Sequence, residues 1–227
     1  MSDRSLRLAV FDCDGTVVDS HASIVAVMTQ AFEDKGLARP DRAAVARVVG
    51  LHLTQAIAYL LPDEPDTVHV ELTESYRKFA TEHRRQGLWD EGLYPGAAEA
   101  IHALDRAGWL IGMATGKSRR GVADTLSRHT LERFFVTIQT PDTAPGKPDP
   151  GMLIQAMQEA GTDPERTVMI GDTTFDMEMA ANAGVPALGV AWGYHDTALL
   201  KDAGAKMIVE SFNEIPAAVD RLIGDGR

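Results

Sequence analysis

The chain has little cysteine and no long apolar stretch, and each absence excludes a class of protein. Cys13 is its single cysteine, so no internal disulfide can form and nothing points to an oxidising compartment. The apolar run near the N-terminus covers only about five residues, much too short for a signal peptide or a membrane span. We therefore expect a cytoplasmic protein without a membrane partner.

Basic side chains are also fewer than acidic ones, 22 against 33, so the formal net charge is −11. Nucleic-acid binding depends mainly on basic patches that neutralise phosphates, so we expect no nucleic-acid partner. A small phosphorylated ligand is compatible with this charge if the site also binds a cation. Hydrophobic residues make up 44% of the chain and charged residues 24%, as in ordinary soluble proteins, so a globular fold is expected.

Short apolar runs alternate with helical stretches over most of the chain, and the 227 residues suffice for a core with a smaller insert. Such alternation favours a parallel, doubly wound sheet with helices on both faces, so we predict an α/β fold. The expected strands cover residues 6–11, 109–114, 134–138, 167–170, 187–190 and 207–209.

The segment after the first expected strand has a different pattern. Apolar residues fall at helical spacing before Gly36, and the pattern stays helical from Asp41 to about Gln86, with Pro65 near the start of its last helix. No convincing strand lies in this segment. We therefore predict a helical domain of residues 19–88, inserted into a core formed by residues 1–18 and 89–227.

Two carboxylates follow the first expected strand, at Asp12 and Asp14, and Gly15 permits a tight turn there. One acid can be a nucleophile that forms an acyl phosphate, while the other gives a proton to the leaving oxygen and then takes one from water. The alternative is an aspartate-rich turn without chemistry. Burial after an apolar strand favours the functional interpretation, because buried acids are costly unless something compensates.

A second acidic cluster, with Asp172 and Asp176, follows the apolar run of residues 167–170. Magnesium prefers oxygen ligands and usually takes only one or two carboxylates, which Asp12 and Asp172 could supply. The alternative makes Asp172 or Thr173 a helix N-cap and Asp176 a favourable charge near the helix start.

Two further places have the character of a phosphate site. Thr115 and Gly116 follow the expected strand 109–114, so their hydroxyl and N–H groups could bind phosphate oxygens, although a helix cap by Ser118 explains the same residues. Lys147 lies in a proline-rich loop that would fix the direction of its amine, and the alternative there is an ordinary surface lysine.

In this order, with a helical insert after the first cluster, the four clusters resemble the haloacid dehalogenase superfamily. Within it the chain is similar to the phosphoglycolate phosphatase-like group, which has a Rossmann-like core and a small helical cap. The resemblance covers nearly the whole chain. The matching residues are Asp12, Asp14, Gly15 and Thr16 for the first motif, Thr115 for the second, Lys147 for the third, and Gly171, Asp172 and Asp176 for the fourth.

The resemblance implies a role for each matching residue. Asp12 would be the nucleophile and a Mg²⁺ ligand, and Asp14 the general acid/base whose backbone carbonyl also binds Mg²⁺. Asp172 would be a further direct ligand, and Asp176 would act through water or from behind the direct ligands. Lys147 would balance charge, while the transferring phosphoryl group would be bound by Thr115 and the amide of Gly116.

The resemblance implies a Mg²⁺-dependent phosphatase that acts on a small phosphorylated metabolite, such as phosphoglycolate or a sugar phosphate, through an aspartyl-phosphate. Asp14 argues against dehalogenation, because the dehalogenases lack the second aspartate. Thr16 favours hydrolysis over a sugar phosphomutase, which often has valine there. A catalytically silent binding or regulatory protein is the third alternative. The expected oligomeric state is a monomer or a homodimer.

Substrate specificity is expected in the helical insert, which should close over the cleft. Arg47, Gly50 and His52 lie near the expected cap loop, so Arg47 and His52 are candidates for substrate contact, although a solvated helix face explains them equally well. Residues 192–194 follow a late strand and either line the edge of the cleft or pack as a plain loop.

Overall fold

Six parallel strands form one sheet in the order β5-β4-β1-β6-β7-β8. The computed structural model describes residues 6–224, so residues 1–5 and 225–227 of the predicted core lie outside the described part. The parallel, doubly wound α/β sheet is confirmed. Its strands are β1 Leu8–Phe11, β4 Leu110–Ala114, β5 Phe135–Gln139, β6 Thr167–Gly171, β7 Ala187–Val190 and β8 Met207–Val209.

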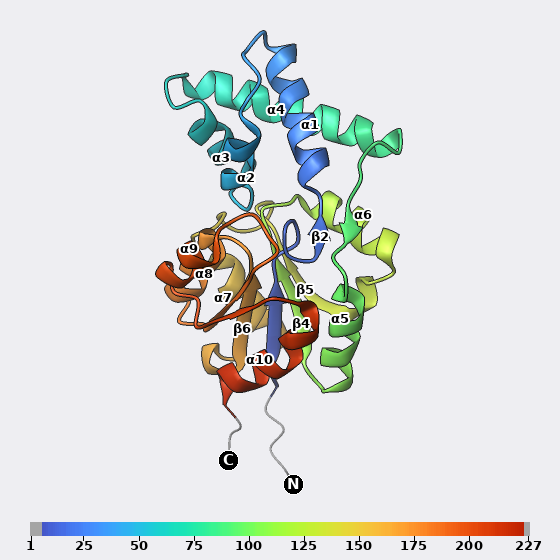
Figure 1. Cartoon of the computed structure of the whole chain (residues 1–227), viewed down its shortest axis with the longest axis vertical. Helices are drawn as coiled ribbons and strands as arrows, with labels where there is room; N and C mark the ends of the chain where they lie inside the picture. Colours follow the sequence, from blue (N-terminus) through green and yellow to red (C-terminus); the bar gives the residue numbers. More distant parts are fainter. Residues whose placement is uncertain (1–5, 225–227) are drawn as a thin grey trace.

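Helices cover both faces of this sheet (Figure 1). Successive residues of β1 point to opposite faces, so Phe11 packs into one core and Val10 into the other. One face is covered by α5 Ala97–Arg106, α6 Arg119–His129 and α10 Ile215–Ile223, and the other by α7 Gly151–Ala160, α8 Thr174–Asn182 and α9 Thr197–Asp202. Short 3₁₀ turns lie at Glu132–Phe134, Pro164–Arg166 and Phe212–Glu214.

A layer of helices lies at one end of the sheet, above the strands in Figure 1. It has its own hydrophobic core, to which Met28, Val45, Ile57 and Leu72 contribute. The stretch 41–86 is divided into three helices, because chain turns lie around Gly50 and before Pro65. The helices of this layer are α1 His21–Asp34, α2 Arg42–Val48, α3 Leu53–Leu60 and α4 Asp66–Arg85. The domain boundaries at 19 and 88 stay a prediction.

The two chain segments that connect this layer to the sheet pair with each other. β2 Val18–Asp19 and β3 Gly92–Leu93 form an antiparallel two-stranded ribbon. The sequence did not predict this ribbon, because two residues are too few to establish an alternating pattern. The helical layer is thus joined to the sheet by a hydrogen-bonded pair of segments.

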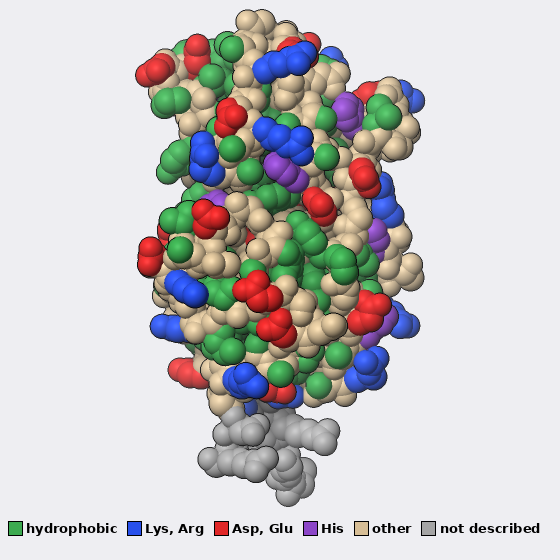
Figure 2. All heavy atoms as spheres, viewed as in Figure 1, with side chains coloured by type: hydrophobic (Ala, Val, Ile, Leu, Met, Phe, Trp, Pro, Cys, Tyr) green, Lys and Arg blue, Asp and Glu red, His purple; other side chains and the backbone are tan. Residues whose placement is uncertain are grey.

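On the face shown in Figure 2, acidic and basic side chains are interspersed among apolar ones, and no broad basic patch is visible there. Across residues 6–224, no helix has both the length and the apolar character required to cross a membrane.

Candidate active site

The carboxyl ends of three neighbouring strands bring the predicted site residues together. β1 lies between β4 and β6, with Phe11 in register with Met113 and Ile170. Asp12 and Asp172 therefore leave the sheet close to the same level, and the loop before α7 supplies a lysine. This edge of a parallel sheet is where ligands are expected.

Three carboxylates meet here, since one oxygen each from Asp12, Asp172 and Asp176 lies within 4.8 Å of the others. All three side chains are buried. Asp172 Oδ1 accepts a hydrogen bond from Thr16 Oγ1 at 2.7 Å, and its Oδ2 accepts one from the Tyr194 amide at 2.8 Å. Asp12 Oδ1 accepts from the Cys13 amide at 2.7 Å, whereas no described residue bonds to the buried Asp12 Oδ2.

The backbone around Asp172 leaves no room for larger residues. A Cβ added to Gly193 would lie 2.1 Å from the Cβ of Asp172, and one added to Gly15 would lie 2.3 Å from Asp172 Oδ2. Gly15 also has a φ of +85°, which favours glycine. Residues 193–194 therefore contact the acidic cluster itself.

Asp176 serves both the helix and the cluster. Thr173 is the N-cap of α8, and Asp176 completes a capping box in which its Oδ2 accepts from the Thr173 amide at 3.0 Å. The helix-cap interpretation offered in the sequence analysis is thus correct for Thr173. This cap does not exclude a role of Asp176 in the acidic cluster, because Asp176 Oδ1 points toward Lys147.

Lys147 is fully buried, so the surface-lysine alternative is wrong. Its Nζ lies 2.8 Å from Asp12 Oδ1 and 2.6 Å from Asp176 Oδ1, at ion-pair distance but without hydrogen-bond geometry. Burial alone would lower the pKa of Lys147, but Asp12 and Asp176 outweigh it and raise the pKa above its usual range. The two carboxylates therefore favour the charged form of this lysine.

One lysine does not neutralise three carboxylates, and the pKa values reflect this. Burial raises the pKa of Asp12 to about 6, with Lys147 opposing the shift and Asp176 adding to it. Burial, followed by the charges of Asp12 and Asp176, raises the pKa of Asp172 well above its ordinary value. The oxygen-only donor set and the excess negative charge fit a hard divalent cation such as Mg²⁺.

Asp14 lies beside this cluster and has partners of its own. Its Oδ1 accepts hydrogen bonds from Ser20 Oγ at 2.6 Å and from Lys117 Nζ at 2.8 Å. Burial would raise the pKa of Asp14, but Lys117 and Ser20 lower it overall, so the carboxylate is ionised.

Sequence reasoning missed Glu91 in this region, and it placed Lys117 at the expected phosphate-binding edge without giving this side chain a role. Lys117 Nζ also contacts Glu91 Oε2 at 2.9 Å, and Glu91 accepts further hydrogen bonds from Trp89 Nε1 and Thr125 Oγ1. Both charged side chains are buried. The only available signal was the position of Lys117 next to Gly116, and nothing in the sequence indicates that Glu91 is its partner.

A cavity of about 670 Å³ lies between this edge of the sheet and the helical layer. Asp12, Asp14, Thr115, Gly116 and His52 all line it. Ser118 caps α6 by accepting a hydrogen bond from the Gly121 amide, so the helix cap expected at Ser118 is also present.

Arg47 does not lie among the residues that line the cavity. Its side chain is exposed and does not line the cavity, and its backbone carbonyl lies 3.2 Å from His195 Nε2. Of the two cap candidates, only His52 therefore lies where a bound ligand could reach it.

The loop between α2 and α3 rests directly on the loops of the sheet. A Cβ added to Gly116 would lie 2.7 Å from the carbonyl oxygens of Gly50 and Leu51, and one added to Gly146 would lie 3.0 Å from His52 Cβ. The helical layer is thus closed over the cluster in this structure.

Comparisons with known proteins agree with this arrangement. A model of the haloacid dehalogenase-like hydrolase family matches residues 9–190. The chain is 35% identical over 221 residues to the "Probable phosphatase IndB" of Dickeya dadantii, covering 95% of this chain and 94% of the relative. It is 30% identical over 233 residues to a phosphoglycolate phosphatase of Agrobacterium fabrum, covering 100% and 98%.

The fold is likewise shared with solved structures. A hydrolase from Pseudomonas syringae superimposes with a TM-score of 0.83 at 24% identity, covering 96% of this chain and 99% of that one. At this level of identity, the likeness concerns the fold alone.

Proposed function

The chain belongs to the haloacid dehalogenase-like hydrolase family, and we propose that it is a Mg²⁺-dependent phosphatase that hydrolyses small phosphorylated metabolites through an aspartyl-phosphate at Asp12. The observation that carries this proposal is Asp12 Oδ2, a buried oxygen without a hydrogen-bond partner among residues 6–224, beside the cationic Lys147. Such an oxygen is available to attack phosphorus. The phosphatase names of both relatives support the same conclusion.

In the proposed first step, a carboxylate oxygen of Asp12 bonds to phosphorus as the bond from phosphorus to the leaving oxygen breaks. Asp14 gives its proton to that oxygen, so the alcohol leaves neutral. In the second step Asp14 takes a proton from water while the water oxygen bonds to phosphorus. The bond from phosphorus to the Asp12 oxygen breaks, which releases inorganic phosphate and restores the Asp12 carboxylate.

Asp14 must be protonated for the first step, although Lys117 keeps its pKa low in the free protein. A phosphate dianion placed beside Asp14 would raise that pKa, because like charges favour the neutral acid. The ion pair with Lys117 suits the second step, in which Asp14 acts as the base.

The carboxylates of Asp12 and Asp172 and the backbone carbonyl of Asp14 would hold Mg²⁺, with Asp176 acting through water. When bound, the ion supplies positive charge that neutralises the phosphoryl oxygens and the acidic cluster. Lys147 adds a second positive charge next to Asp12. The Thr115 hydroxyl and the Gly116 amide would bind the transferring phosphoryl group.

Incubation with p-nitrophenyl phosphate and with phosphoglycolate, with Mg²⁺ or with EDTA, tests this proposal through release of inorganic phosphate. We expect Mg²⁺-dependent turnover, abolished in Asp12→Asn and reduced at least about 100-fold in Asp14→Asn. Asp105→Asn is the matched control, because Asp105 is exposed and far along the chain from the cluster. Unchanged turnover in Asp12→Asn would sink the proposal.

A sugar phosphomutase is the alternative enzyme. Labelled phosphate from a sugar phosphate would then return to a second hydroxyl of the sugar rather than appear as inorganic phosphate. Absence of turnover over a broad panel of phosphate esters would instead favour a binding or regulatory protein.

A further inference from the structure

The cavity is much larger than a two-carbon leaving group requires. Its volume of about 670 Å³ falls within the range of roughly 300–1,000 Å³ typical of sites for sizeable small molecules. Away from the catalytic edge, the part of its lining that comes from the helical layer is mainly apolar, with Ile24, Met28, Val45 and Ala80 as examples. Helix α6 adds Arg120, Asp124 and Arg128. A substrate that fills this space has an apolar body between its phosphate and its far end.

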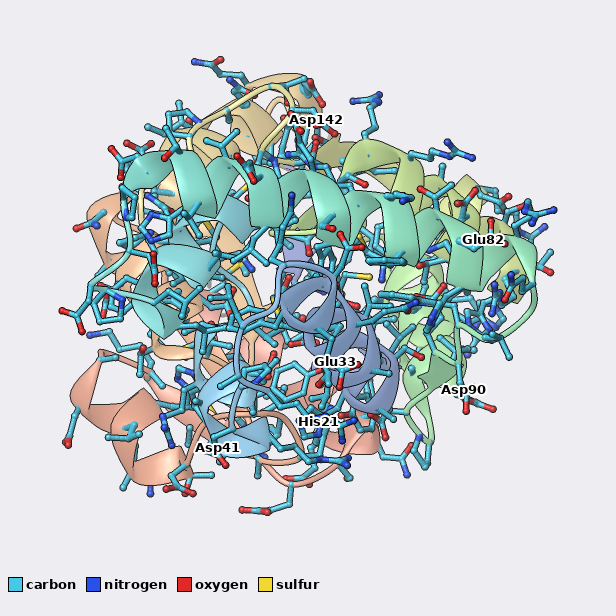
Figure 3. All side chains as sticks on the ribbon, turned by 90° about the horizontal axis from the view of Figure 1, so that it is seen from above. His21, Glu33, Asp41, Glu82, Asp90 and Asp142 are labelled. Atoms are coloured by element: carbon cyan, nitrogen blue, oxygen red, sulfur yellow. The ribbon has the colours of Figure 1, made fainter. Side chains whose placement is uncertain are left out.

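Arg84, near the end of α4, is one of the cations in this lining. Its guanidinium carbon lies 4.0 Å from the ring centroid of Trp89, and its Nε is buried with no hydrogen-bond partner among residues 6–224. Figure 3 labels Glu82 in the last turn of α4 and Asp90 in the segment that follows, and Arg84 lies between these two residues in the sequence.

Three of the neighbouring cations are already committed to other groups, whereas Arg77 and Arg120 also line the cavity. Lys117 contacts Asp14 and Glu91, and Arg85 pairs with Glu82. Arg128 donates to the backbone carbonyl of Trp89. A buried donor without a partner is costly, so a ligand group is the natural acceptor for Arg84 Nε.

We infer that Arg84, stacked on Trp89, binds a carboxylate at the far end of the leaving group, so that the substrate is a phosphate monoester of a long, largely apolar hydroxy acid. The inference rests on the proposed function. Stacking occupies a face of the guanidinium and leaves its donor edge for a planar, bidentate acceptor.

A series of ω-carboxyalkyl phosphates, from phosphoglycolate to progressively longer chains, tests this inference when each acid is paired with its neutral amide. The ratio of kcat/KM for acid over amide should rise with chain length and reach about 10-fold or more, the effect of a hydrogen bond to a charged group. In Arg84→Gln the ratio should fall to about one at every length. Arg133→Gln is the matched control, because Arg133 also stacks on an aromatic ring, Phe134, but does not line the cavity.

The inference is overturned if the wild-type ratio of kcat/KM for acid over amide stays near one at every chain length, or if this ratio is highest for phosphoglycolate. Both outcomes are measured on the wild type, so they hold even if Arg84→Gln does not fold. A binding measurement separates this failure from failure of the proposed function. Calorimetry with the Asp12→Asn protein should give tighter binding of the long acid than of its amide, and Arg84→Gln in that background should remove the difference. If the wild type hydrolyses no ester but this difference is found, carboxylate binding at Arg84 stands and the phosphatase proposal fails.

Discussion

Glu91 and Lys117 form an almost completely buried ion pair, with 2.9 Å between Oε2 and Nζ. Glu91 lies in one of the two segments that join the helical layer to the sheet, and Ser20, which donates to Asp14, lies at the end of the other. Because Lys117 also contacts Asp14, both segments act on the same carboxylate. The position of Asp14 therefore depends on how the helical layer is seated.

Glu91→Gln is expected to lower the free energy of unfolding by about 3 kcal/mol, because Lys117 keeps its buried charge and loses one of its two carboxylate partners. Urea denaturation measures this change. Glu71→Gln serves as the control, since Glu71 pairs with Lys35 at 3.1 Å on the surface and should cost less than about 1 kcal/mol. Equal losses in the two variants would contradict the prediction.

Mg²⁺ is expected to raise the thermal midpoint of the wild-type protein, by an amount that corresponds to about 3 kcal/mol at a hundredfold excess over the dissociation constant. Asp172→Asn should lose this stabilisation, because one of the three clustered oxygens is no longer charged. Asp105→Asn should keep it. Differential scanning calorimetry with Mg²⁺ and with EDTA gives both values, and a full response in Asp172→Asn would count against a metal site in the cluster.

Without metal, Asp12→Asn is expected to be more stable than the wild type above neutral pH. Burial raises the pKa of Asp12 from 3.8 to about 6, so the folded protein binds this proton more tightly than the unfolded chain does. The charged form of Asp12 therefore lowers the free energy of unfolding of the wild type above pH 6, by roughly 2–3 kcal/mol. This loss disappears as the pH falls from about 6 toward 3.8. Urea denaturation in EDTA across this range measures the difference, and a variant that is less stable throughout would refute it.

Gly116→Ala is expected to lower kcat/KM for p-nitrophenyl phosphate at least about 10-fold, because the new methyl group would prevent the approach of Gly50 and Leu51. Steady-state kinetics measures the change. Gly92→Ala is a suitable control, since a Cβ there meets nothing within 4 Å and the residue has no positive φ. Similar kinetics in both variants would show that this approach is not required.

The strands and the meeting of the acids were predictable because they follow from local patterns. β6 was predicted at 167–170 and is observed at Thr167–Gly171, since a strand buried on both faces is a continuous apolar run. Asp12 and Asp172 were expected to meet because neighbouring parallel strands end at the same edge.

The remaining features depend on contacts between distant segments. Glu91 and Lys117 are 26 residues apart, and a charged residue in a polar loop gives no sign that a partner will bury it. Arg47 follows the helical pattern of α2, but the fold turns its side chain to solvent. Arg84 likewise gains its significance from the position of Trp89.

The double use of Asp176 has a consequence for local unfolding. One oxygen of this carboxylate closes the first turn of α8 and the other contacts Lys147. If that turn frays, the lysine loses an anchor and the acidic residues lose part of their neutralising charge at the same moment. Opening of the first turn of α8 and disruption of the Lys147–carboxylate cluster are therefore coupled in one local unfolding equilibrium. Amide hydrogen exchange at the start of α8 would measure this equilibrium.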